Sequence, residues 1–163
     1  MAEAKKSTPP VTLRLKRTFA VPRERVFAAF AHQEQMDRWM CRDAADHIIK
    51  YLKFDFRVGG GFEMEIRTPK HDIYLMHITY REITPPSKIV FTWGHEHVGA
   101  FGKRLGDTLQ GTLVTFEFQE RGKSTEVILT HELLPSQEEY ESHKQGWTGC
   151  LEKLGALIEN GKV

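Results

Sequence analysis

The chain has 163 residues, of which 40% are hydrophobic and 28% charged, and its formal net charge is +1. This size suffices for a domain that buries a core without disulfides, and a net charge so close to zero excludes binding to nucleic acid or to an anionic membrane by bulk charge. No apolar run approaches the roughly 20 residues of a membrane span, and residues 1–10 lack the apolar segment of a secretory signal, so we expect a cytoplasmic protein.

The first part of the chain predicts a tail, one strand and two short helices. Residues 1–10 are polar and end in two prolines, which indicates a disordered tail before a single domain over residues 11–163. Residues 11–21 alternate between apolar and polar side chains, as a strand does. Pro22 suits the first position of a short helix, and residues 33–39 predict a second one.

Six further strands are predicted, and short connections favour antiparallel pairing. Gly59-Gly60-Gly61 is a turn between two of them, since no phosphate-loop residues follow it. Asp55 and Arg57 lie two apart in the first of these strands and predict a structural ion pair. Residues 94–111 contain five glycines with little periodicity and predict a loop. The strands are assigned to residues 52–58, 62–67, 73–83, 89–93, 112–119 and 125–133.

The last part of the chain predicts one long amphipathic helix. Ser136 and Glu139 have the spacing of a capping box, and the helix ends at Asn160-Gly161. Three glycines inside it indicate either close packing on the sheet or room for a ligand. The sequence therefore predicts an α+β fold in which a curved antiparallel sheet wraps around the C-terminal helix. The apolar stripe of this helix consists of Tyr140, Trp147, Cys150, Leu151, Leu154, Leu157 and Ile158.

Several motifs in chain order carry a family resemblance. They are Val21-Pro22-x-x-x-Val26-Phe27, Trp39, Asp55-x-Arg57-x-Gly59-Gly60-x-Phe62, Glu82-Ile83-x-Pro85-Pro86-x-x-Ile89-Val90-Phe91-Thr92-Trp93, Thr125-x-Val127-x-Leu129-Thr130-His131 and Gly146-Trp147-x-x-x-Leu151. Together they resemble the activator of Hsp-90 ATPase homologue group of the START-like superfamily (SRPBCC, Bet v 1-like). The resemblance implies a helix-grip fold with an internal cavity open at one end. The superfamily hosts lipid carriers, hormone receptors, aromatic-ring cyclases and chaperone activators on this scaffold.

The sequence indicates no catalytic residue, cofactor or metal site. It contains no Gly-x-Ser-x-Gly nucleophile elbow and no dinucleotide fingerprint. Cys41 and Cys150 are far apart and outside a Cys-x-x-Cys spacing, which favours free or buried thiols. His95 and His97 would need a third metal ligand on the same face, and none is indicated, so a solvated loop is favoured there.

The other histidines divide into two groups. His77 and His131 lie within apolar strands, where a hydrogen-bonded residue at the edge of the core is more common than a catalytic base. His131 continues the face of Val127 and Leu129, and the resemblance implies a position near one end of the cavity. The remaining four are expected on the surface: His32, His47, His71 and His143.

Aromatic residues on the predicted strand faces give the candidate binding site. Plain core packing accounts for most of them, and an equally weighted alternative is a cavity lining with a few polar tips. The candidate lining residues are Trp39, Tyr80, Phe91, Trp93, Phe116, Phe118, His131 and Trp147.

Two classes of function follow. The first is non-catalytic binding of a small hydrophobic or aromatic ligand in the cavity. The second is a chaperone-associated protein-interaction module that works through the outer face of the sheet or through residues 94–111. Cyclase or hydrolase chemistry in the cavity is a third reading, for which the sequence gives no positive sign.

Overall fold

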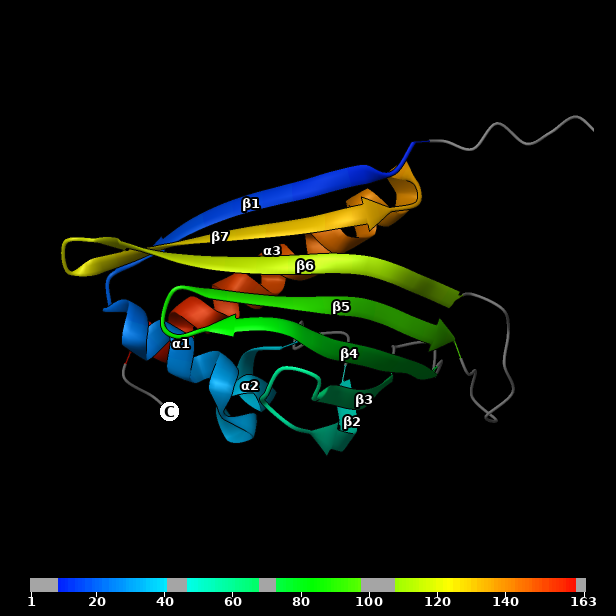
Figure 1. Ribbon diagram of the computed structural model, residues 1–163, viewed down its shortest axis with the longest axis horizontal. Helices are drawn as coiled ribbons and strands as arrows, with labels where there is room; N and C mark the ends of the chain where they lie inside the picture. The colour runs from blue at the N-terminus through cyan, green and yellow to red at the C-terminus, as the bar shows by residue number, and fades with distance from the viewer. Residues whose placement is uncertain (1–8, 41–46, 68–72, 98–107, 161–163) are drawn as a thin grey trace, which may run out of the picture.

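The computed structural model describes residues 9–40, 47–67, 73–97 and 108–160. Its elements follow the predicted order of one strand, two short helices, further strands and one long helix (Figure 1). None of the helices in these ranges is long and apolar enough to cross a membrane. The elements are β1 (Val11–Phe19), α1 (Arg23–Ala31), α2 (Gln33–Trp39), β2 (His47–Phe54), β3 (Gly61–Arg67), β4 (Ile73–Thr84), β5 (Lys88–His97), β6 (Thr108–Arg121), β7 (Ser124–Leu134) and α3 (Gln137–Glu159).

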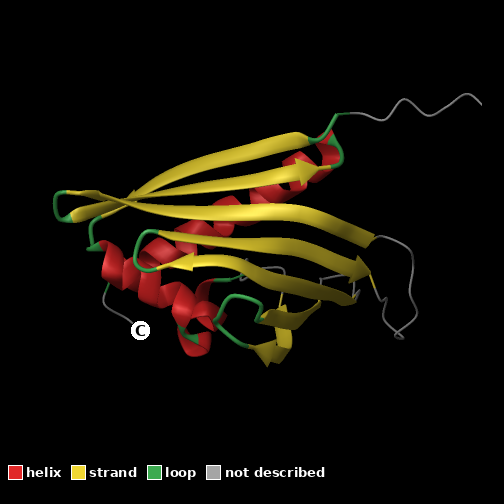
Figure 2. Cartoon of the chain, viewed as in Figure 1, coloured by secondary structure: helices red, strands yellow, loops and turns green. Residues whose placement is uncertain are grey.

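The seven strands form one antiparallel sheet in the order β1-β7-β6-β5-β4-β3-β2. The strands β1 and β2 are its two edges, and α1 and α2 carry the chain from one edge to the other. Figure 2 shows α3 lying along one face of the twisted sheet, with the two short helices near one end of it. This arrangement confirms the predicted α+β fold. Two cationic side chains of the edge strand, Arg14 and Lys16, are exposed to solvent.

The strand predicted over residues 52–58 is misplaced. In the structure β2 ends at Phe54, and Asp55 begins a turn in which its backbone N–H donates to the Gly61 carbonyl at 2.7 Å. The expected ion pair is present in this turn, with Arg57 Nε 2.6 Å from Asp55 Oδ2. Pairing with β3 extends β2 back to His47, through a stretch that shows no clear periodicity in the sequence.

The loop predicted over residues 94–111 is shorter than expected. Strand β5 continues to His97 and β6 begins at Thr108, because backbone pairing with β4 continues through Gly94. Between Trp93 and His95 the register against β6 shifts by one residue. Gly111, with φ +73°, lies in this bulge in a conformation that favours glycine. Residues 98–107 are outside the described part of the chain.

The core lies between α3 and the concave face of the sheet. Strands β6 and β7 turn alternate side chains toward the helix, as predicted, and the helix buries its apolar stripe against them. Ser136 caps the helix, since its Oγ accepts the Glu139 backbone N–H at 3.1 Å. Cys150 is a buried free thiol, while Cys41 lies outside the described residues.

Two of the helix glycines have different surroundings. A Cβ at Gly155 would lie 2.9 Å from a ring carbon of buried Phe19, so the backbone of α3 approaches β1 closely at this point. Gly146 is exposed, and a Cβ there would have no neighbour within 4 Å. The expected packing role therefore holds for Gly155 and is wrong for Gly146, which neither contacts the sheet nor leaves room for a ligand.

Alanine substitutions at these two glycines should have opposite effects. Gly146→Ala should raise the free energy of unfolding by about 1 kcal/mol, because alanine is the better helix former. Gly155→Ala should lower it by about 1 kcal/mol, because overpacking against Phe19 exceeds that gain. Chemical denaturation measures both, and stabilisation by Gly155→Ala would contradict the close approach of α3 to β1.

Candidate functional site

The structure brings the eight predicted lining residues into one array of ring contacts. Trp93 and Trp147 lie closest to one another at the centre, with ring centroids 4.9 Å apart. Phe91 links Trp93 to Tyr80 on one side, and Phe116 links Trp147 toward α1 on the other. All eight side chains are at least 95% buried.

Trp39 is the member whose role is clearly structural. Its indole N–H donates to the Ala29 carbonyl at 2.9 Å, which ties α2 to α1. Its ring packs on Phe30, with centroids 4.6 Å apart, and Phe30 in turn contacts Phe116 and Phe118. The polar group of this tryptophan is thus satisfied within the protein.

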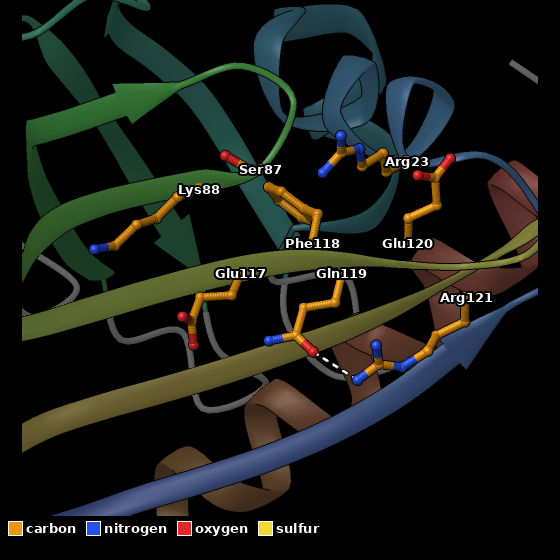
Figure 3. A pocket seen from close by; sticks show the side chains of 8 residues that line it. All are labelled: Arg23, Ser87, Lys88, Glu117, Phe118, Gln119, Glu120 and Arg121. Carbon is orange, nitrogen blue, oxygen red and sulfur yellow. Dashed lines mark hydrogen bonds between the residues drawn. The ribbon is translucent and has the colours of Figure 1, made fainter.

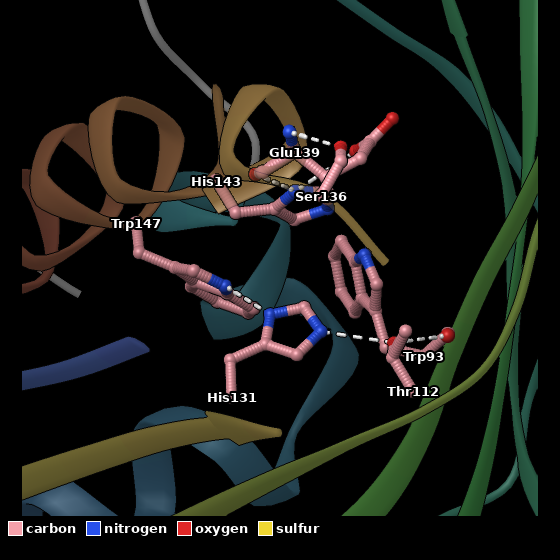
Figure 4. A network of polar contacts seen from close by, with 7 residues as sticks. All are labelled: Trp93, Thr112, His131, Ser136, Glu139, His143 and Trp147. Atoms are coloured by element: carbon pink, nitrogen blue, oxygen red, sulfur yellow. Dashed lines mark hydrogen bonds and ion pairs between the residues drawn. The ribbon is translucent and has the colours of Figure 1, made fainter. Parts of the chain in front are cut away.

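A chain of buried hydrogen bonds joins α3 to three strands (Figure 4). The Trp147 indole N–H donates to His131 Nδ1 at 3.1 Å. Since indole can only donate, His131 carries its proton on Nε2, and Nε2–H donates to Thr112 Oγ1 at 2.9 Å. The Thr112 hydroxyl then donates to the Trp93 carbonyl at 2.6 Å. Each donor and acceptor in this series of three hydrogen bonds therefore has a partner of the required type.

His131 is held neutral in the folded protein. Its pKa is lowered from 6.5 to about 3, chiefly by burial and in smaller part by the neighbouring His143 and His95. The hydrogen bonds act in the same direction, because a proton on Nδ1 would face the Trp147 N–H, which is also a donor. His131 therefore accepts one hydrogen bond and donates another within the core. The sequence favours such a hydrogen-bonded residue over a catalytic base.

Trp93 presents a buried donor without an acceptor. Its side chain is 5% exposed, and its Nε1 has no hydrogen-bond partner among the described residues. The ring lies next to Trp147, His131 and His143 (Figure 4). Leaving a buried N–H unpaired costs about 1–3 kcal/mol, so this atom marks a place where an additional acceptor would be stabilising.

A second cluster lies beside Trp93, where β5 meets the start of α3. His95, Glu139 and His143 each offer one side-chain ligand atom, and these atoms lie within 4.8 Å of one another. The expectation of a solvated loop around His95 is wrong, because this residue lies in β5. The surface position expected for His143 is also wrong, since its side chain is only 10% exposed. Its position four residues before Trp147 places it on the same helix face, a signal that the sequence contains.

His77 does not lie at the edge of the core as expected. Its side chain is 42% exposed on the outer face of the sheet, between Glu63 at 3.7 Å and Glu96 at 3.8 Å. Thr112 is the polar residue that sequence reasoning missed. It shares the inward alternation of Val114, and it is 1% exposed.

Two of the surface hollows formed by described residues bear on the predicted lining. One, of about 390 Å³, lies over the ends of β5 and β6 and is bordered by Arg23, Lys88, Glu117, Arg121 and the edge of Phe118 (Figure 3). The other, of about 350 Å³, lies between β1 and α3. Phe118 is the one predicted lining residue that borders either hollow, and the surroundings of both are strongly charged. Neither hollow has the character of an apolar cavity.

Comparison with known proteins identifies related sequences and structures. The family model described as "Activator of Hsp90 ATPase homolog 1-like protein" matches residues 20–159. A structure of the AHSA1 protein from Silicibacter pomeroyi is 28% identical, with a TM-score of 0.73, and the match covers 90% of this chain and 96% of that one. A protein from Chromobacterium violaceum is 26% identical, with a TM-score of 0.74 and coverage of 91% and 96%. A search of curated proteins finds no match.

The lowered pKa of His131 predicts that stability falls in acid. The unfolded chain takes up a proton near pH 6.5, whereas folded His131 does so only at about pH 3. The stabilisation is therefore complete above pH 6.5 and is lost as the pH falls toward 3, with a slope of at most about 1.4 kcal/mol per pH unit. Urea denaturation should show a shallower slope in His131→Gln, which does not titrate. Equal slopes in both proteins would contradict a buried neutral imidazole.

Two substitutions separate packing from hydrogen bonding at Trp147. Trp147→Ala should destabilise by about 3–5 kcal/mol, as loss of a buried aromatic side chain does. Trp147→Phe keeps a ring but leaves His131 Nδ1 without its donor, which should cost about 1–3 kcal/mol. A loss below about 1 kcal/mol for Trp147→Ala in chemical denaturation would contradict the grip of the sheet on α3.

Proposed function

The chain belongs to the family of activator of Hsp90 ATPase homolog 1-like proteins, and we propose that it binds a small apolar ligand whose hydrogen-bond acceptor meets the Trp93 indole N–H. The ligand is non-ionic or weakly polar. Because neither hollow described above borders Trp93, its body is accommodated by rearrangement of the aromatic side chains around this residue. No catalytic step is part of this function. The observation that carries the proposal is the buried Trp93 donor without an acceptor among the described residues.

The surroundings of Trp93 support a ligand of this kind. Apolar sites with a few placed polar groups are typical of small-molecule binding, and here Phe91 and Trp147 supply aromatic surface on either side. The polar side-chain atoms of His131 and Thr112 already have partners, in one another, in the Trp147 indole and in the Trp93 carbonyl, so they offer the ligand no competing partner. The specificity of the site therefore rests on a single donor.

The family description supports a second candidate function. It names activators of the Hsp90 ATPase, which act on a chaperone, and the sequence also favours a protein-interaction module as the alternative. Native mass spectrometry of the purified protein separates the two classes, because a retained small molecule favours the ligand binder. Stimulation of Hsp90 ATP hydrolysis by a protein that retains no ligand favours the interaction module.

The ligand proposal predicts a loss of affinity when the Trp93 N–H is removed. Two probes of similar size suit the test: 2-acetylnaphthalene, which has a carbonyl acceptor, and 2-ethylnaphthalene, which has none. Trp93→Phe should weaken binding of the ketone about three- to tenfold, the worth of one hydrogen bond, and leave binding of the hydrocarbon unchanged. Isothermal titration calorimetry measures both affinities.

Trp39→Phe is the matched control for this experiment. It removes another buried indole N–H, but one that is already satisfied by the Ala29 carbonyl. It should lower stability and leave the affinity for both probes unchanged. If neither probe binds to the wild-type protein, or if the ketone binds equally well to Trp93→Phe, the proposed ligand contact is wrong.

A further inference from the structure

We propose that His95, Glu139 and His143 form a binding site for a divalent transition-metal ion. His95 is more than forty positions away from the other two residues in the sequence, and the fold brings all three together where side chains of β5 meet side chains from the first turns of α3. One ligand atom from each lies within 4.8 Å of the other two. The Trp93 ring lies beside His143, but the three metal ligands take no part in the hydrogen bond proposed for the Trp93 indole N–H.

The separation of the ligand atoms suits a metal that draws them together. Bonds of about 2.1 Å at tetrahedral angles place ligand atoms about 3.4 Å apart. The 4.8 Å limit therefore requires each side chain to move by roughly 1 Å or less, which small changes in side-chain torsion angles supply. Glu139 is 34% exposed and gives an ion access from solvent.

The backbone beneath the three ligands is well supported. His95 lies in a central strand, paired with Met76 of β4 and with Leu109 of β6. Glu139 and His143 are four residues apart, so they project from one face of α3. The Ser136 cap fixes the first turn of this helix (Figure 4). Sites on rigid elements hold their geometry better than sites on loops.

The hydrogen bonding of His143 decides which of its ring nitrogens is available to a metal. Its Nδ1 lies 2.8 Å from the Glu139 backbone carbonyl, which can only accept, so Nδ1 carries the proton. Nε2 then presents its lone pair. Histidines that bind metals commonly donate their other ring N–H to a carbonyl or carboxylate, which fixes the tautomer and the ring orientation.

The charge around the site is also compatible with a cation. The N-terminal turns of α3 disfavour positive charge through the helix dipole. The Glu139 carboxylate lies in that same turn and offsets this effect, and it also lies 3.3 Å from His143 Nδ1.

Two imidazoles and one carboxylate specify a limited set of metals. Three protein ligands with one open position are typical of tetrahedral Zn²⁺. The same donors with three open positions suit octahedral Fe²⁺. The coordination number of the bound ion separates the two, and both leave an open position for a water or an exogenous molecule.

Zn²⁺ titration of the metal-free protein tests the site. Calorimetry in competition with a chelator should give one equivalent bound, and His95→Ala, His143→Ala and Glu139→Gln should each weaken binding at least about 100-fold. Glu139→Gln keeps the size of the side chain and the backbone cap, so it reports on the site even if a histidine variant unfolds. Trp93→Phe should bind Zn²⁺ like the wild type. The metal-site proposal and the ligand proposal can therefore be refuted independently of one another.

His77→Ala is the matched control. This histidine has carboxylate neighbours too, Glu63 and Glu96, but it lies on the outer face of the sheet. It should leave Zn²⁺ binding unchanged. Absence of binding, equal binding by Glu139→Gln and the wild type, or loss of binding in His77→Ala would each overturn the proposal.

Cobalt identifies the type of site. Co²⁺ bound by the wild type and displaced by Zn²⁺ should show visible absorption that disappears in His143→Ala and persists in His77→Ala. Intense absorption indicates four-coordination and a zinc-like site, whereas weak absorption indicates six-coordination and an iron-like site. Either spectrum supports the site, and an unchanged spectrum in His143→Ala would overturn it.

Discussion

The hydrogen bond from the Trp147 indole to His131 fixes α3 to the sheet. Apolar burial alone is non-directional and would tolerate rotation or sliding of a helix in its groove. A buried donor that loses its acceptor incurs its full desolvation cost, and this penalty selects one position of the helix. The remaining bonds of the chain, through Thr112 to the Trp93 backbone, extend the constraint across β7, β6 and β5.

Much of the fold follows from periodicity in the sequence. The inward alternation of β6 and β7, together with the apolar stripe of α3, is sufficient to place His131 and Trp147 on faces that meet. Glycine content is a weaker guide. It predicts a loop at Gly94, where backbone pairing with β4 maintains the strand, and Gly111 marks a bulge rather than a turn.

The candidate sites are less accessible to sequence reasoning, because each depends on contacts between distant segments. The aromatic residues can be assigned to a common face from the sequence. That the Trp93 N–H has no acceptor among the described residues is seen only in the structure. Likewise, Glu139 and His143 are four residues apart in the sequence, but only the packing of α3 on the sheet brings His95 beside them. Both candidate sites lie around Trp93, whose ring contacts His143, so a few polar side chains in one region of the core carry both proposals.

The open edges of the sheet carry a consequence for association between molecules. An antiparallel sheet that does not close leaves unpaired backbone donors and acceptors on its outermost strands, here β1 and β2. Along β1, in the register centred on Leu15, Arg14 of one copy would lie opposite Lys16 of the other if two copies joined edge to edge in antiparallel fashion. Like charges directly opposite on paired strands are destabilising. The charge pattern of β1 thus disfavours pairing of two copies through this edge of the sheet.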